Sequence, residues 1–177
     1  MLANADATVK RLVAEQEAAA AEAAAEAFAA RIAAAQAAAQ ATASLQSLRD
    51  GAQAGSIALA AIAAARTRIG APYVWGATGP DTFDCSGLTG WAYRQAGFRL
   101  PRVAQDQWFV GRHIDLAELA PGDLLFWASD VRDPRTIHHV AMYVGNGRMI
   151  AAPHTGAFVL EQDVYGNGFI GATRPTG

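Results

Sequence analysis

The chain has a single cysteine among its 177 residues, few aromatic side chains (8%) and no long apolar run. A single cysteine excludes an intramolecular disulfide and a cysteine-rich zinc site. The most apolar run, residues 57–65, is too short to cross a bilayer, and the first residues lack the basic and apolar regions of a signal peptide. A net charge of −2 provides no basic patch for nucleic acid. The composition therefore indicates a globular protein with one free thiol.

Glycine and proline are absent from residues 5–48, which are mostly alanine with interspersed Glu, Gln and Arg. These are strong helix formers, so the segment is predicted to be helical. Its apolar residues are too sparse for a sustained heptad repeat. We favour a solvated spacer or one arm of a helical hairpin, because alanine-rich faces bury little apolar area. The alternative is a helix that lies across the following domain, with Phe28 and Ile32 in a groove, and blocks its cleft.

Two glycines within residues 50–56 separate this segment from the rest of the chain. The predicted organisation is a helical segment at 1–50, a linker at 51–56 and one domain at 57–177. Ser56 is a suitable N-cap for the next helix. Helices are predicted first and strands afterwards, which indicates an α+β domain with a sheet packed on a helix. The helices are expected at 57–69, 86–96 and 104–110, and the strands at 124–127, 139–144, 148–152, 158–161 and 169–173.

Cys85 lies where a turn-rich loop, residues 76–82, gives way to the helix predicted from Ser86. A helix N-terminus carries a partial positive charge, which favours the reactive thiolate over the thiol. A lone cysteine is more often a buried structural residue. The glycine- and proline-containing approach and the polar residues on both sides favour a nucleophile here.

A cysteine nucleophile requires a histidine within hydrogen-bond reach to accept its proton. Of four histidines, His138 and His139 lie at the start of a predicted strand, where successive side chains point to opposite faces. His138 shares its face with an apolar row. His139 lies beside Ala141, whose small side chain leaves room for a thiol, so His139 is predicted to be the base.

Three blocks, residues 73–76, 83–87 and 139–145, together resemble the NlpC-type family of cysteine peptidases. These papain-like enzymes cut the stem peptides of bacterial peptidoglycan, and the actinobacterial members that carry a helical N-terminal segment are the most similar in organisation. The resemblance runs from about Ile57 to the C-terminus. It implies a papain-like α+β fold and amide hydrolysis through a thioester on Cys85 with His139 as base, commonly between D-glutamate and the diamino acid. It implies no metal, and an extracellular or cell-wall location with a signal peptide already removed.

The resemblance also places Tyr73, Asp84 and Ser86 in the acyl-side subsite for the stem peptide. The Tyr73 hydroxyl and the Cys85 backbone N–H are candidate oxyanion donors. Asp84, assisted by Ser86, suits the free ammonium of an N-terminal L-alanine. Helix capping explains these two residues equally well. Trp75 and Trp91 are expected in the core.

Relatives usually carry a polar residue on the next strand to orient the histidine, and this chain has Ala151 at that spacing. The strand register decides whether another residue replaces it. If residues 145–147 form a three-residue loop, His139 faces Pro153 and Ala151 is diagonal. If only residues 146 and 147 form the turn, as a two-residue type I′ turn, His139 faces His154. A backbone carbonyl or water is a further alternative orienter.

Ala151 is either the natural residue or an engineered substitution. Because it replaces the usual polar residue, a second function stays open, that of an impaired enzyme or a non-catalytic module that binds peptidoglycan. Retention of both Cys85 and His139 favours the enzyme, because a binding module has no chemical need for that pair. Acyl transfer has less support, because the sequence shows no membrane anchor. A role in assembly alone also has less support, because the N-terminal segment has no strong apolar stripe.

Overall fold

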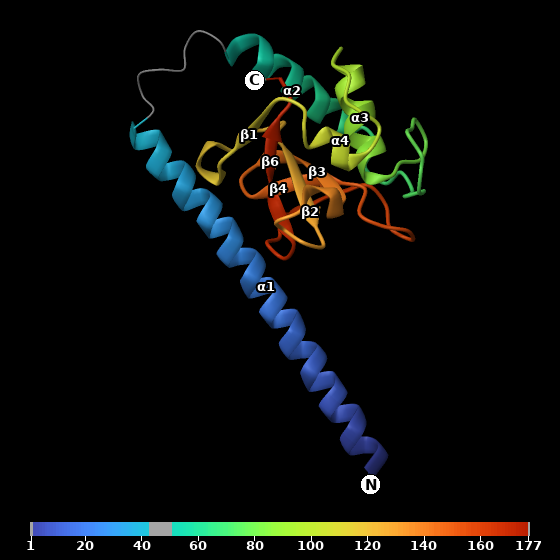
Figure 1. The fold of residues 1–177 in the computed structure, drawn as a ribbon. Coiled ribbons are helices and arrows are strands. Elements are labelled where there is room, and N and C mark those ends of the chain that lie inside the picture. Colours follow the sequence, from blue (N-terminus) through green and yellow to red (C-terminus); the bar gives the residue numbers. More distant parts are fainter. Residues whose placement is uncertain (1, 43–50, 177) are drawn as a thin grey trace.

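The structure is a computed structural model of the chain, and it describes the backbone of residues 2–42 and 51–176 and the side chains of residues 15–39 and 55–176. Figure 1 shows an antiparallel sheet with helices on both sides. The helices are α1 (Leu2–Thr42), α2 (Gly51–Arg66), α3 (Cys85–Gln95) and the short α4 (Ala104–Gln107). This arrangement confirms the predicted α+β class.

The sheet has six strands in the order β1-β6-β2-β3-β4-β5, and every pairing is antiparallel. The strands are β1 (Arg112–Ile114), β2 (Leu124–Ala128), β3 (Ile137–Gly145), β4 (Arg148–Ala151), β5 (Leu160–Asp163) and β6 (Phe169–Arg174). Two 3-10 turns, η1 (Leu116–Glu118) and η2 (Pro134–Thr136), lie in the connections. The sequence patterns did not predict β1, because three residues with two exposed side chains show no apolar alternation.

The central strand β2 is buried along its whole length, so its alternating side chains serve two separate cores. Leu124 and Phe126 pack with α2 and with Cys85 and Leu88 of α3. Leu125 and Trp127 point to the other face, where Phe28 and Ile32 of α1 complete a second core. The sheet therefore separates the cysteine helix from the N-terminal helix.

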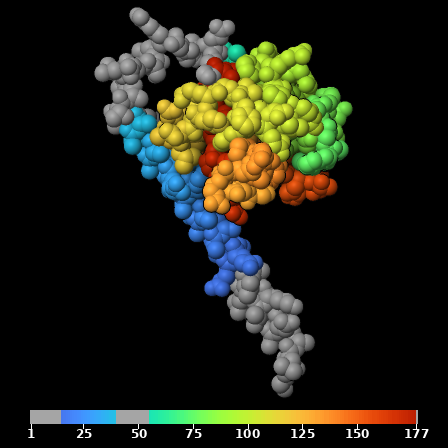
Figure 2. All heavy atoms as spheres, in the orientation of Figure 1, coloured from blue at the N-terminus to red at the C-terminus, as the bar shows by residue number. Residues whose placement is uncertain are grey.

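Helix α1 docks on the sheet through a few large side chains. Phe28 is 7% exposed and Ile32 is 1% exposed, and the Phe28 ring meets Phe169 edge-on at 5.2 Å between centroids. The Gln36 side chain donates to the Leu119 carbonyl at 2.7 Å. Figure 2 shows α1 following one flank of the molecule. The structure therefore places Phe28 and Ile32 in contact with the domain, as in the covering-helix alternative.

The predicted linker at 51–56 is helical in the structure, because α2 begins at Gly51 rather than after Ser56. Ser56 therefore lies within the helix and is not its N-cap. The alanines before and after Gly55 in the sequence have a high helix propensity, so the helix tolerates the glycine. The predicted end of the N-terminal helical segment, at residues 49 and 50, lies outside the described residues. None of the described helices is long and apolar enough to cross a membrane.

Candidate active site

Cys85 is the first residue of α3, and Asp84 is the N-cap of that helix. Asp84 Oδ1 accepts a hydrogen bond from the Gly87 backbone N–H at 2.7 Å. A side chain at Gly87 would collide with the Ala77 carbonyl, so the preceding loop packs directly against the first helical turn. Because the cap and the loop hold both ends of this turn, the position of the thiol is set by local sequence.

The Asp84 carboxylate is saturated with donors. Its Oδ2 accepts from the Gly76 N–H at 2.9 Å, and the Arg102 guanidinium donates to both oxygens. Arg102 also donates to Ser86 Oγ at 3.0 Å. A carboxylate offers about four acceptor positions, so a substrate ammonium would have to displace Arg102. Sequence reasoning missed Arg102, because nothing in an 18-residue separation marks it as a partner of Asp84.

Cys85 is buried, and burial raises the pKa of its thiol, with the Asp84 charge as a further cause. The backbone N–H of Val140, the residue after His139, opposes this by donating to the sulfur. The expected thiolate-favouring environment is therefore not what the structure shows. The physical reasons are, first, the burial of the thiol and, second, the negative charge of Asp84 at the positive end of the helix. The resting group is a thiol that needs a base.

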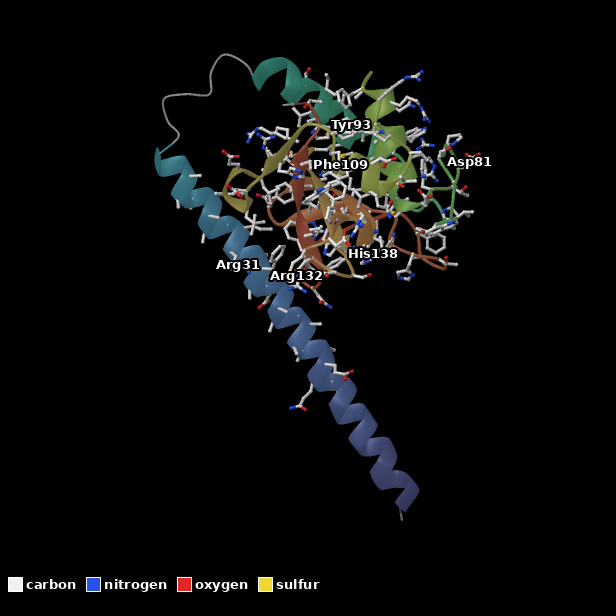
Figure 3. The ribbon with its side chains drawn as sticks, in the orientation of Figure 1. Arg31, Asp81, Tyr93, Phe109, Arg132 and His138 are labelled. Atoms are coloured by element: carbon white, nitrogen blue, oxygen red, sulfur yellow. The ribbon has the colours of Figure 1, made fainter. Side chains whose placement is uncertain are left out.

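His139 projects from β3 beside a break in the strand pairing. Trp127 pairs with His139, but Ala128 pairs with Ile137, so His138 is the extra residue of a bulge. Such bulges re-aim the neighbouring side chains. The His139 ring lies 5.4 Å from the Trp127 ring, centroid to centroid. His138, labelled in Figure 3, is exposed and lines the cleft at the thiol, because the bulge removes it from the apolar face that strict alternation predicts for it.

The imidazole of His139 is buried and incompletely hydrogen-bonded. Its Nε2 atom has no hydrogen-bond partner among the described residues. Burial lowers the pKa of His139 to about 4, and the nearby His138 and His154 lower it further. No hydrogen bond joins its ring to Cys85 Sγ in the described part of the chain, although catalytic hydrogen bonds are often long before substrate binds. His139 is therefore a neutral imidazole at pH 7.

The β3–β4 hairpin combines the two registers that the sequence left open. Asn146 and Gly147 have positive φ angles of 53° and 71°, and Gly145 pairs with Arg148, as in a two-residue turn. A bulge then inserts Val144, so Tyr143 pairs with Met149 and Met142 with Ile150. The bulge restores the register of the longer loop.

Continuing this register puts Ala151 diagonal to His139, in the core that also contains Trp127 and Ala141. Ala151 is 1% exposed and provides no polar atom beyond its backbone. His154 is exposed, and its Nδ1 is hydrogen-bonded to the Thr155 carbonyl at 2.9 Å. Neither residue partners His139 Nε2, which explains the orphaned nitrogen.

A cleft of about 360 Å³ opens at the thiol, lined by side chains that include Trp75, Asp84, Cys85, Ser86, Arg102 and His138. Trp75 is 82% exposed, so the expectation that it belongs to the core is wrong. The backbone explains its exposure, because residues 74–77 form a turn that projects the ring outward. Trp91 is half-buried and packs on the Phe83 ring.

Tyr73 lies beside the thiol and is buried. Burial raises the pKa of its hydroxyl, and the proximity of Cys85 and Asp84 raises it further. The hydroxyl therefore stays protonated at neutral pH and can donate a hydrogen bond. Among the described residues, no group of three or more His, Cys, Asp or Glu side chains is placed to hold a metal ion.

A cysteine at the N-terminus of a helix that packs on an antiparallel sheet is the arrangement of papain-like cysteine peptidases. Within that class, the model of the NlpC/P60 family matches residues 70–174, and the chain belongs to the NlpC/P60 family. The resemblance inferred from the three sequence blocks is thereby confirmed.

Individual relatives agree with this assignment. A probable endopeptidase of Corynebacterium glutamicum is 42% identical over 113 residues, which are 64% of this chain and 51% of that protein. The bifunctional muramidase/DL-endopeptidase CwlT of Bacillus subtilis is 44% identical over 88 residues, 49% of this chain and 26% of that protein. This chain thus spans about half the length of the first relative and about a quarter of the second.

Solved structures show the same fold. An NlpC/P60 family protein from Bacillus cereus superimposes with a TM-score of 0.64 at 34% identity, covering 68% of this chain and 40% of that one. The NlpC/p60 domain of the peptidoglycan hydrolase SagA gives 0.55 at 37% identity, covering 60% and 88%.

Proposed function

We propose that this chain is a cysteine endopeptidase that hydrolyses amide bonds in bacterial peptidoglycan stem peptides, between D-glutamate and the diamino acid, outside the cell or in the cell wall. The observation that carries the proposal is the position of Cys85 at the N-terminus of α3, in an open cleft that His138, the neighbour of His139, also lines. Relatives named endopeptidases and peptidoglycan hydrolases support the choice of reaction and substrate.

The pKa shifts favour proton transfer during attack over a preformed ion pair. Burial raises the pKa of Cys85 and lowers that of His139, so the thiol and the imidazole are both neutral at rest. His139 accepts the thiol proton as sulfur bonds to the substrate carbonyl carbon. The imidazolium then protonates the leaving amine as the carbon–nitrogen bond breaks. Water, deprotonated by the same imidazole, hydrolyses the thioester and regenerates the thiol.

The remaining site residues bind and orient the substrate. The Cys85 backbone N–H and the Tyr73 hydroxyl are the proposed donors to the developing oxyanion. Ser86 lines the acyl side of the cleft. Asp84 lines it too, and through its hydrogen bonds to Gly76 and Arg102 it fixes the cleft wall, in place of the ammonium contact that its sequence position suggested.

Mass spectrometry of purified stem tripeptide and tetrapeptide incubated with this chain, beside a Cys85→Ala control, tests the proposal. We expect cleavage between the second and third residues that is lost in the control. Absence of cleavage by the unmodified chain, or cleavage that survives in Cys85→Ala, contradicts it.

One observation favours a second candidate function, a weak enzyme or a peptidoglycan-binding module. The orphaned Nε2 of His139 beside Ala151 leaves the imidazole without the partner that normally holds it. Binding of the stem peptides without their cleavage is the outcome that this candidate predicts in the same experiment.

A further inference from the structure

Exposed apolar side chains are concentrated on two segments, residues 69–75 and 157–159. Backbone hydrogen bonds join the two segments, so they lie side by side. Half of the large apolar side chains that are exposed in the described part of the chain belong to them, namely Ile69, Val74, Trp75 and Phe158. Single exposed apolar residues are normal, but a group of them beside a cleft marks a binding surface.

The pairing of the two segments places exposed side chains on one face. Pro72 pairs with Phe158 in an antiparallel bridge. Side chains alternate along extended backbone, so Val74 shares the face of Pro72 and Phe158. Tyr73 and Val159 then point to the opposite face. Burial agrees with this assignment, because Val74 is 46% and Phe158 56% exposed. Tyr73 and Val159 are buried in the core that also contains Cys85.

Trp75 connects this exposed face with the cleft at the thiol. It is the second residue of the turn at residues 74–77, and its exposed side chain lines the cleft together with Cys85. We define the apolar ledge by Val74, Trp75 and Phe158. The ledge therefore extends the cleft along the surface of the domain, beyond the side chains that surround the thiol.

The apolar ledge suits a neutral ligand. Residues 69–75 and 157–159 contain no acidic or basic side chain, so these segments offer no counter-charge to an anion or an ammonium group. Exposed aromatic rings bind flat apolar surfaces, and their faces carry the negative end of the ring quadrupole. The C–H groups on the face of a pyranose ring complement such a surface. A neutral sugar therefore matches the chemistry of the ledge.

The size of the ledge limits its occupant. A stable protein–protein interface takes about 20–30 residues from each partner, whereas the ledge consists of three side chains. It therefore suits a short part of a ligand that the cleft already holds. In peptidoglycan the stem peptide is attached to a glycan strand through an amide, so the sugar at the attachment point carries no free carboxylate. The glycan is thus a neutral surface next to the stem peptide.

We infer that the apolar ledge binds the glycan strand of peptidoglycan, with sugar rings on Trp75 and Phe158 while the attached stem peptide lies in the cleft. The inference rests on the proposed function for the identity of the cleft. Contact with the glycan adds binding energy that a released stem peptide lacks. The chain should therefore bind glycan-linked stem peptides more tightly than free ones.

NMR titration of the isotope-labelled Cys85→Ala chain tests the inference without turnover. The probe is chitotetraose, a neutral β-1,4-linked tetramer of N-acetylglucosamine that carries no peptide. We expect chitotetraose to bind, and we expect Trp75→Ala and Phe158→Ala each to weaken its binding about tenfold or more. Phe158→Tyr keeps an aromatic face and should retain most of the affinity.

The matched control is Phe109→Ala. Phe109, labelled in Figure 3, is 69% exposed and belongs to neither segment of the ledge. Its removal should leave the affinity for chitotetraose unchanged. All of these side chains are exposed, so the variants should fold, which urea denaturation checks. No binding of chitotetraose, or equal weakening by the control, overturns the inference.

Steady-state kinetics of the active chain provide a second test. Phe158 does not line the cleft at the thiol, so Phe158→Ala should raise KM for a disaccharide-linked tripeptide about tenfold, with little change in kcat. Hydrolysis of the free tripeptide should be unaffected. An equal loss with both substrates would assign Phe158 to a peptide subsite and contradict the inference. Because the binding of chitotetraose requires no cleavage, failure of the ledge is distinguishable from failure of the proposed peptidase.

Discussion

The chemistry at the residue scale depends on one nitrogen atom. His139 has a buried Nε2 with no partner among the described residues, and the residue diagonal to it is Ala151. Burial without a counter-charge explains why the pKa of His139 falls to about 4. The imidazole is therefore available as a base at neutral pH, but it is a weak one and is oriented by packing against Trp127 rather than by a hydrogen bond.

Restoring a partner should strengthen this base. In Ala151→Glu, a carboxylate near Nε2 stabilises the imidazolium, so the acid limb of the kcat/KM profile should move up from about pH 4. We expect kcat to rise by about tenfold or more, since orienting groups in such triads contribute at least this much. Ala151→Leu introduces similar bulk without a polar atom and is the control. Equal kcat and pH profiles in the two variants would show that Nε2 needs no partner.

The depressed pKa also makes folding stability depend on pH. The pKa of His139 is about 4 in the folded chain, against the ordinary histidine value of 6.5 in the unfolded chain, so between these values the unfolded chain binds more protons. Stability should therefore fall as the pH falls through this window, by about 3 kcal/mol at pH 4. Denaturant unfolding at pH 7 and pH 4 measures this loss.

The matched variants for that measurement are His139→Gln and His138→Gln. The first should lose much less stability on acidification than the unmodified chain. The second replaces an exposed neighbour and should behave like the unmodified chain. A loss of stability that is the same in all three proteins would assign the acid sensitivity to other groups.

At the element scale, the N-terminus of α3 joins the nucleophile to its surroundings. Asp84 caps the helix, accepts from the Gly76 N–H and pairs with Arg102, so one carboxylate connects the helix, the loop before it and the loop after it. The Gly87 position, where a side chain would meet the Ala77 carbonyl, keeps the loop close to the helix. Substitutions here should therefore affect folding as well as binding.

Asp84→Ala should lower the free energy of unfolding by roughly 2 kcal/mol or more, because it removes a buried cap and leaves Arg102 unpaired. Asp133→Ala is the matched control. Asp133 also caps a helical turn and pairs with a nearby arginine, but the turn is short and the ion pair is exposed. Its loss should lower the free energy of unfolding much less than the loss of Asp84. Urea denaturation compares the two, and equal losses would show that Asp84 serves only as a cap.

At the scale of the whole molecule, aromatic side chains join α1 to His139, the proposed base. Phe28 contacts Phe169, Phe169 contacts Trp127 at 5.7 Å between ring centroids, and Trp127 contacts His139. No described side chain of α1 lines the cleft at the thiol. Docking of α1 therefore supports the histidine and does not block the thiol.

Phe28→Ala should destabilise the chain by about 3 kcal/mol, because it empties a buried aromatic site. Leu59→Ala, which shortens an exposed side chain of α2, is the control and should change little. We also expect kcat to fall in Phe28→Ala and in a chain that lacks residues 1–50, as Trp127 loses its support. A rate increase on deletion would instead establish that the helix inhibits the enzyme. Thermal unfolding and peptide hydrolysis measure both effects.

Local and periodic features of the sequence determined much of the fold. Alanine content predicted α1, and the short apolar runs of β2 and β3 predicted the central strands, because each signal lies within a few residues. The family of the chain was also readable from three short blocks. The assignments of Cys85 and His139 rest on the same blocks and remain predictions until the variants are measured.

Only the tertiary structure decided how distant segments meet. It paired Asp84 with Arg102, exposed Trp75, inserted the Val144 bulge that sets the position of Ala151, and docked Phe28 against the sheet. None of these follows from periodicity, because each depends on contacts between residues far apart in the chain or on a single-residue shift in strand pairing. The sequence by itself supplied the candidate groups for the chemistry, because the motifs are local, and long-range packing decided the charge states and the partners of those groups.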